Sequence, residues 1–406
     1  MESGSHPVDG SDPIPYASQS ITESDIDYVK KALTSHSITR GKWVESFESA
    51  IATECGAPHA IAVSNGTVAL YLAMLALGAG PHTHAICPAV TFLATANAFL
   101  MCGARLHYAD VDPKSALIDT AKLEAQLRGI RETHPHANIM LASVSFAGDA
   151  RHLPETDRIC KEYGVIHIED AAHSLGGTYM TLSSGTFKSG SCKHSDAAIL
   201  SFHPAKHITT GEGGMILVRD SAVARQVRRL RNHGFLADDP RPSELEEPWA
   251  YCQTELGINA WMTDIQAALG LSQLSRLQSN LNRRRQLAAW YAESLAARPF
   301  SDSISVLPYD NHHAYHLALI QWKSSALRRL AYEHLHRKGI RVQIHYVPLY
   351  RQPLQRQRAV SCAPLPGAES YYAGCMSLPL YPSISDAALD RVMDSLRDFC
   401  ARQTSG

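Results

Sequence analysis

Seven short apolar runs, separated by segments with helical periodicity, are the feature that most constrains how this chain folds. Most neighbouring runs are joined by a stretch whose apolar residues recur every three to four positions. Parallel strands need such crossover helices, and strands buried on both faces are apolar throughout. The pattern predicts an α/β fold with a mainly parallel seven-stranded sheet flanked by helices. The runs are 60–63, 84–87, 105–109, 139–146, 165–168, 197–202 and 215–218, and the clearest helical segments are 24–33, 68–77, 93–101, 156–163 and 222–233.

The pattern changes in the last third of the chain. A helical stretch rich in Ala, Leu, Gln and Arg covers 262–295 without a proline, and we expect it to bend or to link two parts of the molecule. Shorter strands at 318–322 and 341–345, proline-rich loops and a final helix over 386–400 then predict a smaller α+β unit.

Two domains are also the normal expectation for a chain of 406 residues. We predict a flexible N-terminus over 1–15, a large α/β domain over 16–280 and a small C-terminal α+β domain over 281–406. The first segment is rich in Gly, Ser, Asp and Pro and has no hydrophobic core of a signal peptide.

Charge and composition narrow the class of function. The net charge is −1 and no long Lys/Arg run occurs, so nucleic acid is not an expected partner. No apolar stretch is long enough to span a membrane. The nine cysteines, Cys362 among them, form no Cys-x-x-Cys pair, and the 21 histidines show no metal-ligand spacing. These features predict reduced thiols, no metal site and a cytoplasmic location.

The first of three polar strand ends follows the run 60–63. Ser64, Asn65, Gly66 and Thr67 lead from this strand into a helical pattern. A small polar turn at a helix start aims free backbone N–H groups at an anion such as a phosphate. The same residues are typical of an ordinary turn with an N-cap, so this turn alone leaves both interpretations open.

The second polar strand end follows 165–168. Glu169 and Asp170 come directly after this strand, and two alanines and His173 come next. A carboxylate here can cap a helix, which is common. It can also pair with a protonated heterocyclic nitrogen, as the pyridinium of pyridoxal 5′-phosphate (PLP) requires, while the alanines let a flat ring approach closely.

The third strand end carries a lysine. Lys206 lies in a turn between Ser201 and the glycine-rich segment 211–214. Most lysines are solvated surface charges, but the strands on either side of this one are expected to be buried. Burial lowers the pKa of a lysine and leaves the neutral amine that a Schiff base needs. Together the three strand ends supply a phosphate cup, a pyridinium partner and a cofactor lysine, so the cofactor predicted is PLP.

Around Asp170 and Lys206 the sequence resembles the sugar aminotransferases of the DegT/StrS type, a branch of the fold-type I PLP enzymes. The similarity extends from about residue 15 to residue 382. The run 201–214 is most similar to the pseudaminic-acid branch, whose members aminate a UDP-linked 4-keto-6-deoxy-N-acetylhexosamine. Other matching stretches are 88–97, 257–259, 262–268 and 377–382.

The resemblance implies a role for each matching position. The catalytic residues that it implies are Lys206, Asp170 and His173. The cofactor-binding residues that it implies are Asn65, Gly66, Thr67, Phe92, Asp170, His173, Ser201, Lys206 and Asn259. The substrate-binding residues that it implies are His345, Tyr346 and Trp261.

The resemblance implies a more specific role for three of these residues. Phe92 stacks on the cofactor ring and His173 lies near the ring hydroxyl. Asn259 reaches the phosphate of the neighbouring subunit, so the resemblance implies a homodimer with shared active sites. For Phe92 and Tyr346, taken alone, ordinary core packing is an equally good interpretation.

Two departures from the family pattern stand out. Trp261 occupies a position where relatives usually have arginine, and this removes a cationic fork that can bind phosphate or carboxylate. The segment Thr181–Lys193 is longer than usual and rich in Gly, Ser and Lys, so we expect an exposed hairpin or loop.

The predicted activity is transamination of a UDP-linked 4-keto-6-deoxy-N-acetylhexosamine, with L-glutamate as donor, for cell-surface glycan synthesis. Alternatives are a GDP- or dTDP-linked keto sugar as substrate, or a PLP-binding paralogue that has lost activity. A related sugar dehydratase has histidine in place of Lys206, and a silent PLP-binding regulator needs a DNA-binding module for which residues 1–15 leave no room. An aminotransferase for small amino acids needs an arginine fork that the sequence does not place.

Overall fold

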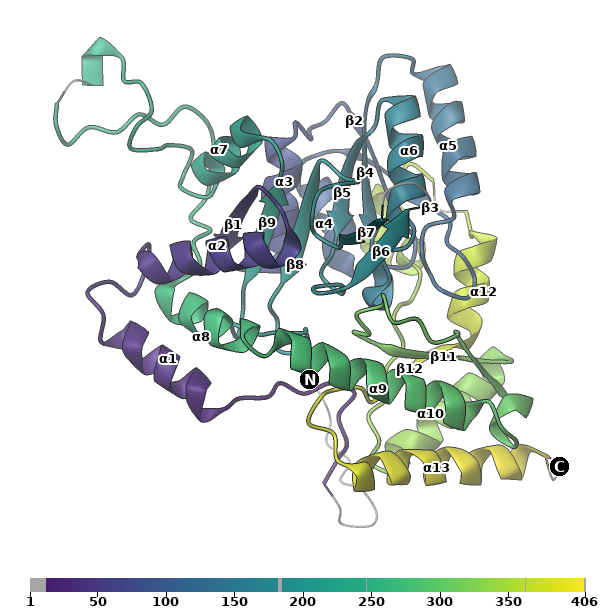
Figure 1. Ribbon diagram of the computed structural model, residues 1–406. Coiled ribbons are helices and arrows are strands. Elements are labelled where there is room, and N and C mark those ends of the chain that lie inside the picture. Colours follow the sequence, from purple (N-terminus) through teal and green to yellow (C-terminus); the bar gives the residue numbers. More distant parts are fainter. Residues whose placement is uncertain (1–11, 182–184, 246, 362, 405–406) are drawn as a thin grey trace.

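The computed structural model describes residues 12–181, 185–245, 247–361 and 363–404. A seven-stranded sheet forms its centre, in the order β1-β9-β8-β5-β4-β2-β3 (Figure 1). All its strands run parallel except β9, which is antiparallel to both neighbours. The predicted mainly parallel sheet is confirmed, and each predicted run agrees with a strand to within two residues. The strands are β1 (His59–Val63), β2 (Thr83–Pro88), β3 (Arg105–Ala109), β4 (Asn138–Val144), β5 (Ile166–Asp170), β8 (Ala197–Ser201) and β9 (Gly214–Val218).

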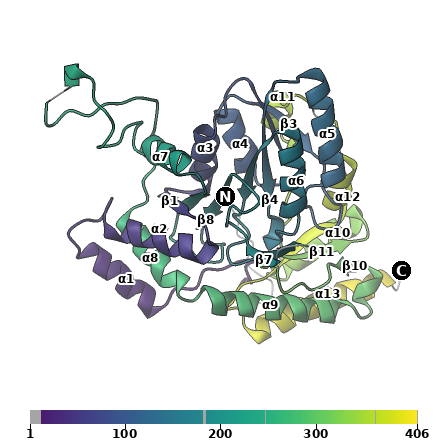
Figure 2. The same ribbon diagram turned by 45° about the horizontal axis from the view of Figure 1, so that its top comes forward.

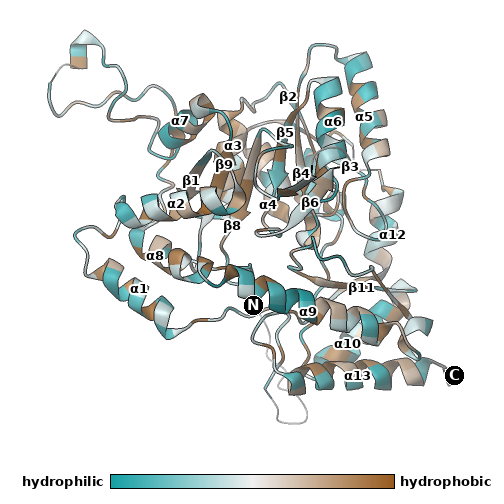
Figure 3. Cartoon of the chain, viewed as in Figure 1, coloured by the Kyte–Doolittle hydropathy of each residue, from teal (hydrophilic) through white to brown (hydrophobic). Residues whose placement is uncertain are grey.

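Helices cover both faces of this sheet, as the apolar strands require (Figures 1 and 2). Successive residues of a strand point to opposite faces, so Ile61 and Val63 pack in one core while Ala60 and Ala62 pack in the other. Figure 3 shows the strands as the most apolar part of this layer. One face carries α3 (Gly66–Ala76), α4 (Leu93–Met101) and α7 (Ser221–Leu230), and the other carries α2 (Lys42–Cys55), α5 (Thr120–Thr133) and α6 (Leu153–Tyr163).

A smaller α+β region lies beside the large sheet, as predicted (Figure 1). Its antiparallel sheet has the order β10-β11-β12. The helices over 325–337 and 386–404 pack on a separate core, whereas the helix over 366–374 packs on a core of the large sheet. The elements are β10 (Ile304–Val306), β11 (Ala318–Trp322), β12 (Cys375–Leu378), α10 (Ser325–Arg337), α11 (Pro353–Arg358), α12 (Pro366–Gly374) and α13 (Asp386–Thr404), with the short turns η3 (Phe300–Asp302) and η4 (Leu349–Arg351).

One local prediction about this region is wrong, and a second, the flexible N-terminus over 1–15, stays a prediction. The predicted strand over 341–345 is an extended segment with a single bridge, Gln343 to Ser377, because it lies beside β12 for only one residue pair. Ile14, within the segment predicted to be flexible, is buried in the small core and pairs with Ile340. Residues 1–11 of that segment lie outside the described residues.

The helical stretch over 262–295 is two helices, α8 (Asp264–Leu274) and α9 (Leu277–Leu295). The bend falls at Ser275 and Arg276, where the Arg276 side chain reaches across to Asp25 of α1 (Glu23–Leu33) at 2.8 Å. An ion pair with a buried carboxylate, and the Ser275 hydroxyl that donates to the Ser272 carbonyl, thus lie at this bend, where there is no proline. The predicted boundary at 280 and 281 falls inside α9, and the division into domains stays a prediction.

The glycine- and serine-rich segment before β8 contains a hairpin of β6 (Thr178–Thr181) and β7 (Gly185–Lys188). The predicted hairpin is therefore present in its described part, while 182–184 lie outside the described residues, as does Cys362. No helix among the described residues is long and apolar enough to cross a bilayer. The remaining short turns are η1 (Phe146–Gly148) and η2 (Ser243–Leu245).

Candidate functional site

A cavity of about 550 Å³ lies where parallel strands of the large sheet reach their carboxyl ends. Turns after β1, β2, β5 and β8 form one side, and Tyr16 with residues of the C-terminal region closes the other. Open α/β sheets bind ligands at this edge. Ten of the twelve predicted site residues line the cavity: Asn65, Gly66, Thr67, Phe92, Asp170, His173, Ser201, Lys206, His345 and Tyr346.

The turn between β1 and α3 forms a cup for an anion. Asn65 caps the helix by accepting a hydrogen bond from the Val68 amide at 2.9 Å. The amides of Gly66 and Thr67 belong to the first turn of α3, so they have no partner within the helix. A Cβ on Gly66 would lie 2.9 Å from the Cβ of Ser201, so only glycine lets β8 approach this closely. The cup therefore combines helix amides with the Ser201 hydroxyl at the end of β8.

Asp170, the last residue of β5, presents a buried carboxylate to the cavity. Its Oδ2 accepts a hydrogen bond from the Thr95 hydroxyl at 2.8 Å, and its Oδ1 accepts one from the Ala172 amide at 3.2 Å. Because Thr95 donates its only proton to Asp170, the Thr91 hydroxyl donates to Thr95, at 2.9 Å. Burial raises the pKa of Asp170, while Thr95, Ala172 and the Lys206 charge oppose that rise.

Lys206 lies in the turn after β8 and lines the same cavity. Burial lowers the pKa of its amine to about 8, and the nearby Asp170 charge works in the opposite direction. At neutral pH an amine with this pKa is neutral in roughly a tenth of the molecules, far more than an exposed lysine. A neutral amine is the form that attacks a carbonyl or accepts a proton.

His173 has a defined tautomer. Its Nδ1 accepts a hydrogen bond from the Ala147 amide at 3.3 Å, so the ring proton is on Nε2. Burial, and secondly the Lys206 charge, hold the pKa of His173 well below its usual value. His173 is therefore a neutral hydrogen-bond donor beside the lysine.

His345 and Tyr346 form the opposite wall of the cavity. His345 Nδ1 shares a hydrogen bond of 2.8 Å with the Ser377 hydroxyl, and its carbonyl accepts one from Tyr371 at 2.9 Å. Burial lowers the pKa of His345 to about 3. The Tyr346 ring lies 5.9 Å from that of Phe92, whose side chain remains 55% exposed at the mouth. This wall offers flat aromatic faces and a neutral imidazole.

Asn259 and Trp261 do not line the cavity of their own chain. Asn259 is exposed and pairs with Asn232 in an isolated bridge. The Trp261 ring lies 3.7 Å from the Arg231 guanidinium, and its Nε1 donates to Asn232 at 3.2 Å. Trp261 therefore covers a buried arginine, which itself pairs with Glu48 at 2.6 Å.

Sequence reasoning missed several residues that line the cavity or hold a residue that does. Thr95, which bonds to Asp170, lies in the matching stretch 88–97, one helical turn after Thr91, and that spacing was an available signal. Tyr16 and His316 line the cavity but lie far apart in the chain, and no sequence spacing points to them. Ser377 lies in the matching stretch 377–382, but only the fold shows that it holds His345.

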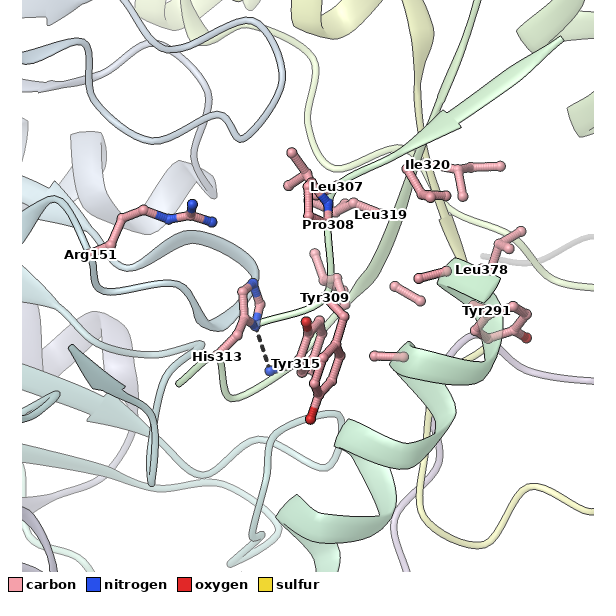
Figure 4. A pocket seen from close by; sticks show the side chains of 15 residues that line it. Arg151, Tyr291, Leu307, Pro308, Tyr309, His313, Tyr315, Leu319, Ile320 and Leu378 are labelled. Atoms are coloured by element: carbon pink, nitrogen blue, oxygen red, sulfur yellow. Dashed lines mark hydrogen bonds between the residues drawn. The ribbon is translucent and has the colours of Figure 1, made fainter. Parts of the chain in front are cut away.

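A second cavity, of about 50 Å³, lies between α9 and the segment around Tyr309 (Figure 4). Aliphatic side chains form most of its lining, with Arg151 and His313 at one edge. The His313 ring accepts a hydrogen bond from the Tyr315 amide at 2.8 Å. Among its described lining residues there is no lysine or carboxylate, so it lacks the amine and the carboxylate that the large cavity brings together. In the part of the chain that the structure describes, no group of His, Cys, Asp or Glu is arranged to hold a metal ion.

Comparison with known proteins adds independent findings. The profile of the DegT/DnrJ/EryC1/StrS aminotransferase family matches residues 19–397. The chain is 32% identical over 393 residues to a UDP-4-amino-4,6-dideoxy-N-acetyl-beta-L-altrosamine transaminase of Campylobacter jejuni, covering 96% of this chain and 98% of that protein. It is 31% identical to a GDP-perosamine synthase of Caulobacter vibrioides, covering 94% and 97%.

A similar solved structure is Helicobacter pylori PseC, an aminotransferase involved in the biosynthesis of pseudoaminic acid. It superimposes with a TM-score of 0.84 at 26% identity, over 96% of this chain and all of that one.

Proposed function

The chain belongs to the DegT/DnrJ/EryC1/StrS aminotransferase family, and from that premise we propose that it transfers an amino group from L-glutamate to a UDP-linked 4-keto-6-deoxy-N-acetylhexosamine. The product is a 4-amino sugar nucleotide for polysaccharide biosynthesis. The observation that carries the proposal is the meeting of Lys206, its pKa lowered to about 8, with the buried Asp170 in one cavity below an anion cup.

The enzyme is an aminotransferase and its cofactor is PLP. The residues present fit this group. The missing Cβ of Gly66 and the first-turn amides of α3 leave a cradle for the phosphate. Asp170 is a buried carboxylate of the kind that a pyridinium nitrogen requires, and Lys206 is the amine for its carbonyl carbon.

When bound, PLP supplies an electrophilic carbonyl for amines and a ring that accepts electrons. The residues do the rest. Lys206 Nζ, when neutral, would take the α-proton of the amino donor and deliver it to the former carbonyl carbon of the cofactor, and in the second half-reaction it would move a proton in the opposite direction, onto the sugar carbon that receives the amino group. The Asp170 carboxylate would hold a proton on the ring nitrogen, and the Nε2–H group of His173 would donate to the ring hydroxyl. Phe92 would cover the ring at the mouth and limit the access of water.

The substrate class rests on size, charge and relatives. The cavity has a volume of about 550 Å³, large enough for a sugar beside the cofactor, and its outer wall carries His345 and Tyr346. Flat rings and N–H groups suit a sugar and its nucleotide. The relative with 32% identity is a transaminase of a UDP-linked dideoxy amino sugar. A GDP-linked keto sugar is the second candidate, favoured by the nearly equal identity to the GDP-perosamine synthase and by the absence of arginine at Trp261.

One assay separates these substrates. Purified protein is given L-glutamate with a UDP-, GDP- or dTDP-linked 4-keto-6-deoxy sugar, and 2-oxoglutarate release and the aminated product are measured. We expect the highest kcat/KM with the UDP-linked N-acetylated sugar. Equal or better turnover of a GDP- or dTDP-linked sugar would show that the UDP assignment is wrong while leaving the aminotransferase intact.

We also propose that the enzyme works as a homodimer with shared active sites. Asn259 is exposed in the single chain and does not line the cavity of that chain. The carbonyl of the adjacent Ala260 accepts a hydrogen bond from the Ser64 amide, next to the anion cup. The segment between α7 and α8 projects from the molecule (Figure 1). Its described part exposes large apolar side chains. Such patches are typical of protein interfaces. The most exposed of them are Trp249, Tyr251 and Leu256, at 81%, 65% and 85%.

Hybrid dimers test site sharing. Lys206→Ala and Asn259→Ala proteins, each impaired, are mixed after partial unfolding and refolded together. If sites are shared, the mixture recovers part of the wild-type rate, because one of the two sites in a hybrid dimer is intact. Active monomers in sedimentation would contradict the proposal.

We place the enzyme in the cytoplasm. The eight described cysteines are free, and seven of them are buried, which suits a reducing compartment. Mass mapping of alkylated protein from cells tests this, with all thiols expected in reduced form.

A further inference from the structure

Three buried imidazoles stand in a row beside Lys206. The ring of His173 lies 4.3 Å from that of His316, and His316 lies 5.9 Å from His207, measured between ring centroids. All three side chains are at most 5% exposed. They come from different segments: His173 follows β5, His207 follows Lys206, and His316 precedes β11. The middle ring, His316, lines the cavity and has no role in the reaction described above.

His173 has few other supports. Its one side-chain hydrogen bond is the 3.3 Å contact from the Ala147 amide, which is long for an N–H···N bond. The nearest aromatic ring among the described residues besides His316 is Phe146, at 5.7 Å. The direction of the Nε2–H group therefore depends on the His316 ring, which lies against His173 at an interplanar angle of 39°.

His316 holds both supports of His173 at once. Its ring contacts the His173 ring, and its backbone amide donates to the Ala147 carbonyl at 2.7 Å. Ala147 is the residue whose own amide binds His173 Nδ1. The three residues therefore contact one another in turn: His173 bonds to Ala147, Ala147 bonds to His316, and the His316 ring lies against the His173 ring. A change of the His316 ring removes the last of these contacts and leaves the cofactor lysine untouched.

The segment that carries His316 is itself fixed. The Ala314 amide donates to the Gly148 carbonyl at 2.9 Å, and a Cβ on Gly148 would lie 2.7 Å from the Tyr315 amide nitrogen. On the other side the buried Arg284 donates to the carbonyls of Tyr315 and His316, at 3.2 and 3.5 Å. Within the described residues no carboxylate pairs with Arg284. Its guanidinium donates instead to backbone oxygens, which also include that of Leu380 at 3.0 Å.

His316 makes no side-chain hydrogen bond of its own among the described residues. Its Nδ1 is buried without a partner. An unpaired buried nitrogen is costly, and an apolar ring at this position would avoid the cost. The shortest ring contact of His316 among the described residues is the one with His173, at 4.3 Å between centroids and with the planes tilted by 39°.

We propose that His316 is a positioning residue for His173, which it holds by the contact between their rings and through Ala147 so that the His173 Nε2–H group faces the bound cofactor. The inference rests on the proposed function, because it assumes that His173 meets PLP. It assigns a part of the reaction site to the segment before β11, which contributes no predicted catalytic residue.

A double-mutant cycle on cofactor affinity tests the proposal without any assay of turnover. PLP is titrated into the apoprotein of wild type, His173→Phe, His316→Ala and the double variant, and the Kd is read from the change in tryptophan fluorescence. We expect His316→Ala to raise the Kd about tenfold in the wild-type background and less than twofold in the His173→Phe background, because the two residues act as one unit. Equal effects in both backgrounds would overturn the proposal.

Two further variants separate the ring from its nitrogens and guard against misfolding. His316→Phe keeps an aromatic ring against His173 and is expected to stay within about twofold of the wild-type Kd, while His316→Gln fills similar volume without a ring and is expected to match His316→Ala. A loss in His316→Phe as large as in His316→Ala would overturn the role of the ring contact. Thermal unfolding of each apoprotein identifies any variant that fails to fold, and His316→Gln then replaces His316→Ala in the cycle.

The same titration distinguishes a failure of the proposed function from a failure of the role of His316. If the wild type shows no saturable PLP binding, the proposed function fails. If the wild type binds PLP and His173→Phe weakens the binding while His316→Ala does not, only the role of His316 fails.

Discussion

Two groups of three histidines lie near opposite ends of the same sheet, and their rings are about equally close. In the site row, His173 and His316 are 4.3 Å apart, and in the distal group, His84 and His134 are 4.6 Å apart. The site row lies at the carboxyl ends of strands. The distal group lies near the amino end of β2, with His107 of β3 as its third member.

The groups differ in what holds and surrounds them. His173 and His207 are bonded to backbone atoms, and Lys206 and Asp170 lie beside the row. In the distal group, His84 and His107 bond to each other at 3.1 Å, and the charges that act on both come from His134 and Arg105, with no lysine or carboxylate among them. The rings are thus at similar distances in both groups. The groups differ because a lysine and a carboxylate, both near the carboxyl ends of strands, lie beside the site row alone. Changes at the two ends should therefore have separate effects, on chemistry at one and on stability at the other.

The largest effect is expected from Lys206→Ala. Loss of the amine removes both the attachment of the cofactor and the proton carrier, so transfer should fall about ten-thousand-fold. Borohydride reduction of the wild-type holoenzyme should attach PLP to Lys206, as read by peptide mass mapping. Lys188→Ala is the matched control, since that lysine pairs with Glu54 at 3.0 Å on the surface. A label on Lys188 or Lys193 would contradict the assignment.

Asp170→Asn tests the charge beside the site row. The amide keeps the shape and can still accept from Thr95, but it cannot hold a proton on the ring nitrogen. Turnover should fall at least about a hundredfold, which is typical of losing one strong electrostatic interaction. Glu169→Gln is the control, because Glu169 is buried away from the cavity and bonds to Ser145 at 2.8 Å. Near wild-type rates in Asp170→Asn would mean that Glu169 serves the ring.

Thr95→Val should have an intermediate effect. It removes the hydroxyl that donates to Asp170 Oδ2 at 2.8 Å and leaves a side chain of the same shape. A hydrogen bond to a charged group contributes about 1.5 kcal/mol or more, so turnover should fall about tenfold while the fold remains. Thr95→Ser, which keeps the hydroxyl, should restore most of the rate. Full activity in Thr95→Val would show that Ala172 alone orients the carboxylate.

The sequence predicts the strands of the large sheet well because burial on both faces makes them apolar throughout. It predicts ten of the cavity residues because each follows a strand or a matching motif. The small sheet is harder to predict, since β10 has only three residues and is too short to show the period of a strand. His316 and Tyr16 reach the cavity only through the tertiary fold. The same holds for Arg284, whose burial no local pattern indicates.

The smallest effect is expected at the distal group, from His107→Gln. Burial, and secondly the charge of His84, lower the pKa of His107 to about 4. The unfolded chain has a histidine pKa of about 6.5, so between pH 6.5 and 4 the unfolded state binds more protons than the folded state. Stability therefore falls as the pH drops through this window and is unaffected by this residue above it. His107 is only half-buried, so at pH 5 the loss should be on the order of 1 kcal/mol rather than the full value of its shift.

His107→Gln does not titrate, so it should flatten this part of the pH dependence. Urea unfolding at pH 7.5 and pH 5.0 measures the difference for wild type and variant. Wild type should lose about 1 kcal/mol more than the variant over this interval, and the variant should turn over at the wild-type rate at pH 7.5. The site row has lowered pKa values of the same sign, so a residual slope should remain in the variant. If His107→Gln instead left the slope unchanged and reduced turnover, the two histidine groups would be coupled through the sheet, and the division of chemistry and stability between its ends would not hold.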